Sequence, residues 1–463
     1  MSFSIDSKQW ARQQFGDCDL GDRRRTKRLI QMAEHVANHP AASFPGQMPD
    51  WADLKAAYRL FAADDVTFQA IATPHWRQTR QAPPGRYLVV NDTTEIDFGY
   101  HREIPGLSRI GNGSRSGFLL HNALLVDART QALVGVAGQT IHYRRPAPKN
   151  ETKAQRFKRP RESQMWGTVV DQVGPPPTGV EWVHVCDRDA DDFEVFCHFL
   201  QNRSQWVVRA SSRTRWILAP SGEKVRLDDH LKTLPLVGSY ELHLRARPGV
   251  RARVAKLEVR MGALQMPKPR HHSDYVRALN PAPIPMGMVW VREVNPPKGC
   301  KAIDWALYTS LPLNSFEDAW QIVEYYECRW VVEEYHKALK TGCSVQSRLL
   351  QNADRLEAMV GLMSVVALRL LQLKSVARHE PDRPARTIIP PLWLEMLKAA
   401  RKNLRRVCDL TIHEFYRELA KLGGFLGRRH DGDPGWITIW RGWERLNTLV
   451  RGAELARKNE KCG

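Results

Sequence analysis

The chain has 463 residues, more than one compact hydrophobic core usually organises, so we expect two or three domains. Its net charge of +19 favours a polyanionic partner, with nucleic acid ahead of an anionic membrane surface. Eight scattered cysteines without a CxxC pair argue against a zinc site and a disulfide framework. The longest apolar run, 358–373, is interrupted by Arg369 and is too short to span a bilayer, so we expect a buried helix there.

The first 70 residues are predicted to be helical. Two stretches carry this prediction: a strongly basic one, DRRRTKRLI at 22–30, and an amphipathic one, LKAAYRLF at 54–61. A helix with Arg24, Arg25 and Arg28 on one face suits a DNA backbone or groove. A solvated basic helix is the alternative for this stretch taken alone.

Strands and helices are predicted between residues 86 and 210. The strand RYLVVN is followed by Asp92, and the strand VEWVHVC is followed by Asp187. This order predicts a mixed sheet flanked by helices, with ligand sites at the carboxyl ends of strands. A single aspartate at such an end is usually a turn or cap residue, but two at corresponding ends indicate a site. The expected strands are 86–91, 118–126, 133–143, 180–186 and 205–210, the last with Arg209 at its tip, and the expected helices are 163–173 and 189–200.

A different pattern follows, from about residue 211 to residue 313. Alternating stretches separated by Pro- and Gly-rich segments predict an inserted β subdomain. Trp305 lies near its end, where a tryptophan is more often a core residue than a functional one.

The segment Ser315–Lys340 contains no Pro or Gly, and Ser315 with Asp318 forms a capping-box pattern, which predicts one helix beginning here. At 100° per residue, one face of this helix carries a single carboxylate, Glu333, among a phenol and cations. The cations suit phosphate oxygens and the glutamate suits a divalent metal, whereas a solvated face with i, i+4 ion pairs is the alternative. The residues on this face are Tyr326, Arg329, Glu333, Lys337 and Lys340.

Three carboxylates, Asp92, Asp187 and Glu333, are candidates for one site. If they converge, they can hold two divalent ions, and Mg²⁺ suits such a site because it needs few carboxylates. Competing chemistries lack support, because the sequence contains no GxxxxGK[ST], GxSxG or HExxH motif. The sequence therefore predicts metal-assisted phosphodiester chemistry.

The C-terminal part is predicted to be helical. A long apolar helix at about 354–373 is followed by a Pro- and Arg-rich linker at 374–391 and by helices over 392–463. Trp436, Trp440 and Trp443 recur at helical spacing, which indicates either an internal core or an interface with another subunit.

These motifs together resemble the IS4-type DDE transposases, nearly from end to end. The signature helix of that family, Y-(2)-R-(3)-E-(6)-K, is matched here by Tyr326, Arg329, Glu333 and Lys340. The segment after Lys340 does not align cleanly, so Arg348 matches a DNA contact only loosely. Further matching segments are LGDRRRTKRL at 20–29, AAYR at 56–59, NDTT at 91–94, VCDRDAD at 185–191, NPPKG at 295–299, LGGF at 422–425 and IWRGWE at 439–444.

The resemblance implies a mixed α/β fold, in which an RNase H-like catalytic core with an inserted β subdomain is flanked by helical domains. It implies a DNA-end-binding domain at 1–70, a catalytic domain at 71–373 with the insertion at about 211–313, and a dimerisation domain at 374–463. The implied activity is cut-and-paste transposition by a homodimer bound to two element ends and target DNA. The steps are a 3′ nick, hairpin formation and resolution, and strand transfer. A bacterial, cytoplasmic, nucleoid-associated location without a membrane partner is expected.

The resemblance also implies residue roles. Asp92, Asp187 and Glu333 would be the catalytic, metal-binding triad, with Mg²⁺ as cofactor and Mn²⁺ as a substitute. Trp305 matches the tryptophan that stacks on a flipped base, which changes the interpretation of that residue. The implied DNA-binding residues are Tyr326, Arg329, Lys337, Lys340, Trp305, Trp330, Arg25, Arg28, Arg59 and Arg209.

Two other functions stay open. A catalytically inactive DNA-binding relic or inhibitor would act through mixed dimers, and the intact triad and N-terminus weigh against it. A structure-specific nuclease without strand transfer is disfavoured by the β insertion and by Trp305, because simple nucleases need no base-flipping apparatus.

Overall fold

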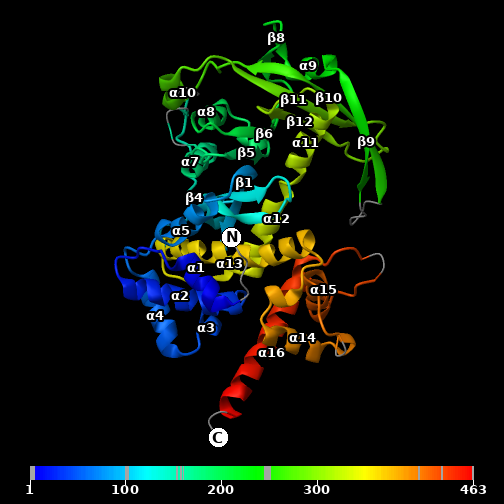
Figure 1. Cartoon of the computed structure of the whole chain (residues 1–463). Coiled ribbons are helices and arrows are strands. Elements are labelled where there is room, and N and C mark those ends of the chain that lie inside the picture. Colours follow the sequence, from blue (N-terminus) through cyan, green and yellow to red (C-terminus); the bar gives the residue numbers. More distant parts are fainter. Residues whose placement is uncertain are drawn as a thin grey trace.

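The computed structural model describes residues 6–99, 104–152, 155–156, 159, 161–244, 252–404, 407–428 and 431–460. A large sheet and its helices form the upper part of the molecule in Figure 1, and the two terminal helical regions lie below. The predicted mixed α/β class with helical ends agrees with this arrangement.

The N-terminal region is helical, as predicted. Polar side chains cap the helices: for example, Asp22 accepts the Arg24 N–H and Asp50 accepts the Asp53 N–H. The last of these helices continues to Arg80, so the predicted boundary at residue 70 falls inside it. The helices are α1 (Ser7–Phe15), α2 (Arg23–Asn38), α3 (Phe44–Gln47), α4 (Trp51–Phe61) and α5 (Phe68–Arg80).

Twelve strands of the described residues form one mixed sheet. β4, β3 and β1 are antiparallel neighbours, β1, β5 and β6 are parallel, and β12, β11 and β10 continue antiparallel from β6. The predicted β insertion therefore extends the same sheet and does not form one of its own. The strands are β1 (Gly85–Asp97), β2 (Ser108–Ile110), β3 (Arg115–Asp127), β4 (Leu133–His142), β5 (Val180–Cys186), β6 (Gln205–Arg209), β7 (Trp216–Leu218), β8 (Lys224–Arg226), β9 (Leu236–Leu244), β10 (Arg253–Met266), β11 (Ile284–Glu293) and β12 (Asp304–Thr309).

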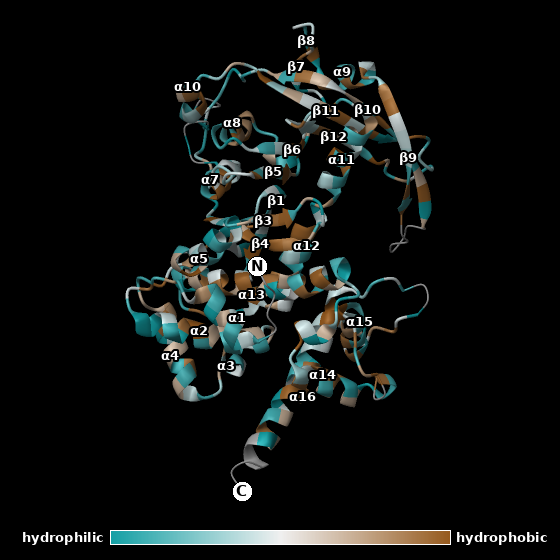
Figure 2. Ribbon diagram, in the orientation of Figure 1, coloured by the Kyte–Doolittle hydropathy of each residue, from teal (hydrophilic) through white to brown (hydrophobic). Residues whose placement is uncertain are grey.

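Helices cover both faces of this sheet. Alternate residues of β1 point to opposite faces, so Val89 packs with Val169 of α7 and Val90 packs into the core that contains α13. The apolar residues of β3, β4 and α13 meet at the centre of the molecule, where Figure 2 is brown. The helices are α7 (Gln164–Val173) and α8 (Phe193–Gln201) on one face, and α11 (Phe316–Glu327), α12 (Trp330–Lys337) and α13 (Ala353–His379) on the other. Two short helices, α9 (Leu227–Thr233) and α10 (Asp274–Leu279), lie among β7–β11 in the chain.

Among the described helices, α13 is long and apolar enough to cross a membrane by length and composition. In this structure 88% of its most apolar stretch is buried inside the protein, which confirms the prediction of a buried helix. Arg369 of α13 is buried as well, with its guanidinium 5.1 Å from the ring of Trp10 and 5.6 Å from that of Trp443. One cation thus joins α1, α13 and the C-terminal region.

The C-terminal region contains α14 (Pro391–Ala400), α15 (Ile412–Leu422) and α16 (Trp436–Glu460). Trp440 and Trp443 are buried, and Trp443 packs on Trp393 with ring centroids 4.7 Å apart. The internal-core interpretation is therefore confirmed for Trp440 and Trp443, and Trp436 is half-buried against the same cluster. The linker predicted from residue 374 begins later, because α13 continues to His379. α16 also reaches the N-terminal region, where the Asn447 amide donates to the Asn38 carbonyl.

Candidate active site and nucleic-acid interface

The register of two neighbouring parallel strands aligns two of the candidate carboxylates with each other. β1 and β5 are parallel with Val90 opposite Val185, and the same register two residues further on aligns Asp92 with Asp187. Asp187 follows β5 directly and caps a short 3₁₀ turn, where its carboxylate accepts the N–H of Asp189 at 2.9 Å.

The position of Asp92 corrects one detail of the sequence prediction. Asp92 was predicted at the end of its strand, but β1 continues to Asp97 because β3 goes on pairing with it beyond the end of β5. Asp92 is therefore at the end of the parallel part of the sheet and not at the end of its strand.

The third carboxylate lies on the helical segment that the sequence predicted as one helix. The capping box of Ser315 and Asp318 is present, as predicted. The helix is divided at Cys328–Arg329 into α11 and α12, and a π-helical turn, Ala338–Gly342, follows α12. Glu333 lies in the first turn of α12.

Arg329 connects two of the three carboxylates. Its Nη1 is 2.9 Å from Oδ2 of Asp92, and its Nη2 is 2.7 Å from Oε1 of Glu333. The structure thus brings the strand of Asp92 and the helix of Glu333 together through one guanidinium. Within the part of the chain that the structure describes, no three His, Cys, Asp or Glu side chains are already gathered closely enough to hold a metal ion.

The electrostatics of this site oppose ionisation of Asp92. Burial raises the pKa of this carboxyl most, and the charges of Asp187 and Glu333 raise it further. Arg329 and the N–H of Thr93 lower it, and the result is a pKa of about 7. Neutralisation of the Asp92 charge is therefore favourable in this site.

Aromatic side chains lie close to Arg329, which pairs with two of the carboxylates. Trp305 of β12 and Tyr326 of α11 pack edge to face with ring centroids 5.7 Å apart. Tyr326 is buried, whereas the ring of Trp330 is 55% exposed and lies 5.8 Å from the Arg329 guanidinium carbon. Arg209 ends β6 and donates to the carbonyl of Asp304, next to Trp305, at 3.2 Å. These residues come from four separate segments, and only the tertiary structure makes them neighbours.

Comparison with protein families identifies both ends of the chain. Residues 7–66 match the family described as transposase DNA-binding, and residues 365–463 match the family described as transposase Tn5 dimerisation domain. Together the two matches support a Tn5/IS4-type transposase. These matches support DNA and a second copy of the chain as partners of this transposase. Both matched segments lie outside the stretch that carries Asp92, Asp187 and Glu333.

The DNA-binding region of the transposase holds three predicted contact residues. Arg25 forms an ion pair with Asp65 at 2.7 Å, and Arg28 forms one with Asp53. Arg59 in the last turn of α4 is exposed. Two of the three arginines are therefore held by acidic side chains in the DNA-free protein.

The cations that follow Glu333 lie in different surroundings. Lys337 ends α12 and is exposed. Lys340 lies in the π-helical turn, where burial lowers its pKa and the charges of Glu95 and Asp97 act against that effect.

The loose match of Arg348 to a DNA contact is wrong. Its side chain is 3% exposed and donates to the carbonyls of Pro40, Ala42 and Cys343 at 2.6 to 2.7 Å. Every partner is backbone or buried side chain, so this arginine joins the DNA-binding region of the transposase to the segment after α12. The sequence showed its charge but not its burial.

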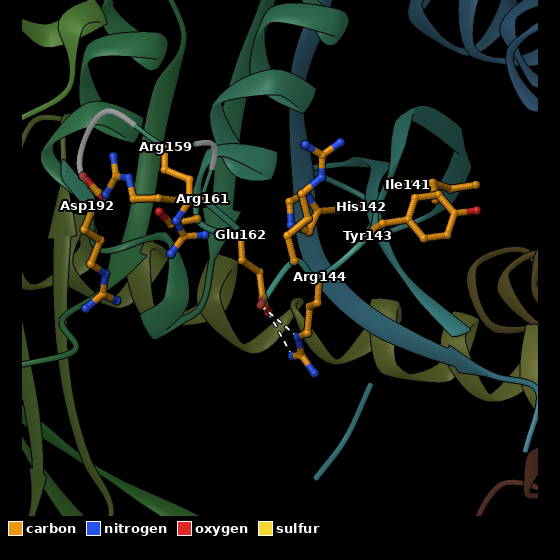
Figure 3. Close-up of a pocket in the computed structure, with 11 residues that line it drawn as sticks. Ile141, His142, Tyr143, Arg144, Arg159, Arg161, Glu162 and Asp192 are labelled. Atoms are coloured by element: carbon orange, nitrogen blue, oxygen red, sulfur yellow. Dashed lines mark hydrogen bonds and ion pairs between the residues drawn. The ribbon is translucent and has the colours of Figure 1, made fainter. Parts of the chain in front are cut away.

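A cavity of about 650 Å³, lined by residues between Ile141 and Ser163 and by Asp192, was missed by sequence reasoning. Arg144 pairs with Glu162 at 3.0 Å, as Figure 3 shows, and with Glu95 of β1 at 2.7 Å. The many arginines of residues 144–161 are visible in the sequence. The sequence does not show that the beginning and the end of this segment fold together around one cavity. The arginines that line the cavity are Arg144, Arg145, Arg156, Arg159 and Arg161.

Proposed function

We propose that this transposase cuts and joins DNA at the ends of its own mobile element, with Asp92, Asp187 and Glu333 as the catalytic carboxylates. The observation that carries the proposal is that Arg329 pairs with both Asp92 and Glu333, while the register of β1 and β5 aligns Asp187 with Asp92. The strand order β4-β3-β1-β5-β6, antiparallel and then parallel, supports an RNase H-like core.

The donor chemistry at this site fits Mg²⁺, with Mn²⁺ as a substitute, because carboxylate oxygens are hard ligands. The raised pKa of Asp92 supports a cation at this site, and Arg329 supplies the positive charge in this structure. Asp92, Asp187 and Glu333 would hold the metal once Arg329 releases its two carboxylates. When bound, divalent ions activate a water or 3′-hydroxyl and stabilise the leaving oxygen.

The cationic and aromatic residues around the carboxylates would position DNA. Arg329, once released, would join Lys337 and Lys340 in donating to phosphate oxygens of the element end, which fixes the attacking and leaving oxygens in line. Trp305 would stack on an extruded base during hairpin formation, beside Tyr326. The residues proposed to contact DNA around this site also include Trp330 and Arg209.

The rest of the DNA path would lie on the surrounding surfaces. Arg25, Arg28 and Arg59 would recognise the element end, and the arginine-lined cavity would extend the cationic surface beside the active site. The C-terminal helices would join two copies into a synaptic dimer. The reaction would run through a 3′ nick, a hairpin, its resolution and strand transfer, on nucleoid DNA in a bacterial cytoplasm.

Linear DNA carrying the inverted ends that flank the protein's own gene tests this proposal. In Mg²⁺ or Mn²⁺, the wild type is expected to give hairpin-ended fragments and Glu333→Ala none. Glu334→Ala is the matched control, because the neighbouring carboxylate is paired with Lys374 of α13 at 2.5 Å and is expected to be dispensable for cleavage. End binding without cleavage in wild type would refute the catalytic proposal.

A second candidate function is an inactive relic or inhibitor that acts through mixed dimers. It is favoured by one observation, the placement of Arg329 between Asp92 and Glu333 where a metal ion would bind. Under this alternative, wild type and Glu333→Ala bind and pair element ends equally and neither cleaves. A nuclease without strand transfer would instead give nicks but no hairpins, and Trp305→Ala would leave its products unchanged.

A further inference from the structure

A row of polar side chains runs from the strand of Asp92 into the core. In the antiparallel register Asp92 of β1 lies opposite Asn122 of β3, and Asn122 lies opposite Gln139 of β4. Residues opposite each other in neighbouring strands share a face of the sheet, so all three point towards the side covered by α12 and α13. The side chains of Asn122 and Gln139 are almost completely buried.

This row is hydrogen-bonded to the helix that carries Glu333. Asn122 Nδ2 is 3.0 Å from Nε2 of His336, which is three residues after Glu333 and therefore on the same side of α12. Gln139 Nε2 donates to Asn122 Oδ1 at 2.6 Å, and Trp76 Nε1 of α5 donates to Gln139 Oε1 at 3.2 Å. The chain of hydrogen bonds thus begins in α5 and ends one turn from Glu333.

The indole of Trp76 fixes the direction of the whole chain. An indole N–H can only donate, so Gln139 must turn its oxygen towards it and its NH₂ towards Asn122. Asn122 then presents its own NH₂ to His336, whose Nε2 must accept, and the imidazole is neutral with its proton on Nδ1. Burial lowers the pKa of His336 to about 3, in agreement with a neutral ring.

A second contact holds the same turn of α12. The hydroxyl of Tyr335 donates to the carbonyl of Ser364 in α13 at 3.1 Å, and Gln139 Nε2 is 3.3 Å from that hydroxyl. Burying so many polar groups is costly unless each is hydrogen-bonded, and a satisfied network permits one arrangement of its members. α12 is therefore fixed against both the sheet and α13.

We propose that Asn122, Gln139 and His336 are positioning residues that keep Glu333 in place relative to Asp92. In this structure Arg329 is the direct link between Asp92 and Glu333, because its guanidinium pairs with both carboxylates. A second link is needed if Arg329 leaves them. When Arg329 releases them to bind DNA, the buried row still joins α12 to β3, which is paired with the strand of Asp92. This inference rests on the proposed function, because it assigns the row to the same catalytic site.

His336→Leu tests the role, because leucine fills the space without an acceptor for Asn122. The expected result is unchanged affinity for the element end, a cleavage rate lower by about 10- to 100-fold, and a higher Mn²⁺ concentration for half-maximal cleavage. His336→Gln is expected to restore most of the rate, since its side-chain oxygen reaches the position of Nε2. The double variant Asn122→Ala/His336→Leu should cleave no more slowly than the slower of the two single variants, because both changes remove the same hydrogen bond.

His184→Leu is the matched control. His184 is also buried and lies 3.1 Å from an asparagine, Asn91, but it packs against Phe199 of α8 on the opposite face of the sheet. This variant is expected to lose stability and to keep the Mn²⁺ requirement of the wild type. The proposal is overturned if folded His336→Leu behaves in the same way. If His336→Leu does not fold, Asn122→Ser, whose side chain is too short to reach His336, is measured instead.

The Mn²⁺-induced rise in Tm separates this inference from the proposed function. The rise is expected in the wild type and should be smaller in His336→Leu, whether or not DNA is cut. An equal rise in both proteins, or none in the wild type, would overturn the positioning role. A wild type that binds Mn²⁺ but never cleaves would refute the proposed function and leave the Tm comparison to decide the positioning role.

Discussion

Replacing Asp92 by Asn is expected to stabilise the metal-free protein at neutral and alkaline pH. The folded-state pKa of this carboxyl is about 7 against an ordinary value of 3.8, because burial and the charges of Asp187 and Glu333 oppose its ionisation. A raised carboxyl pKa means that the folded state binds more protons than the unfolded state between these two values. The free energy of unfolding therefore falls as pH rises from about 4 to about 7 and stays low above that range.

The magnitude follows from the size of the pKa shift. A shift of about three pKa units at 1.36 kcal/mol per unit gives about 4 kcal/mol. Asparagine has the shape of the protonated carboxyl without its charge, so Asp92→Asn should be more stable than wild type by about 4 kcal/mol above pH 8. Near pH 4 the two proteins should be equally stable.

Thermal unfolding in EDTA between pH 4.5 and 8.5 measures this effect as the difference in Tm between variant and wild type. The difference should increase with pH, and saturating Mn²⁺ should reduce it by stabilising the wild type alone. Glu334→Gln, which removes a carboxylate paired with Lys374, should show no such increase. A difference that is constant with pH, or a variant less stable than wild type at pH 8, would refute the reasoning.

Three further predictions concern other parts of the chain. Arg348→Ala should reduce the free energy of unfolding by about 3 kcal/mol, because it leaves buried carbonyls unpaired, and folded variant should keep its DNA affinity in a filter-binding assay. The logarithm of the association constant for non-specific duplex DNA falls with log salt, and Arg145→Ala, which removes a cation that lines the cavity, should make this slope shallower by about 0.9. Arg129→Ala, just beyond the opposite end of β3, should leave the slope unchanged. In Gly442→Ala the new Cβ would lie 1.9 Å from the carbonyl oxygen of Leu419, so α15 and α16 must separate, which calorimetry should detect as a lower Tm.

Much of the candidate site could be predicted from local sequence signals. The capping box at Ser315 places the start of α11, and the spacing of Arg329 and Glu333 puts both on one side of a helix. The strand pattern places Asp187 directly after β5. Each of these signals operates within about one or two turns of helix or one strand, where hydrogen bonding and side-chain periodicity depend on neighbouring residues.

Other features were not accessible because they depend on distant partners. The extension of β1 to Asp97 requires β3, and the burial of Arg348 requires carbonyls from the N-terminal region. The polar row is equally non-local, since Asn122 and His336 are 214 positions apart in the chain. Polar residues in an otherwise apolar strand gave no indication of which helix they would contact.

The sequence by itself determined the chemistry available to this transposase: its positive charge, its acidic and cationic candidates, and the helices and strands that carry them. Only the tertiary structure decided which of these residues meet. It placed Arg329 between Asp92 and Glu333, removed Arg348 from the surface and tied α12 to the sheet through Asn122. The physical reason is that charge and periodicity are properties of short segments, whereas burial and hydrogen-bond partners are set by packing between segments far apart in the chain.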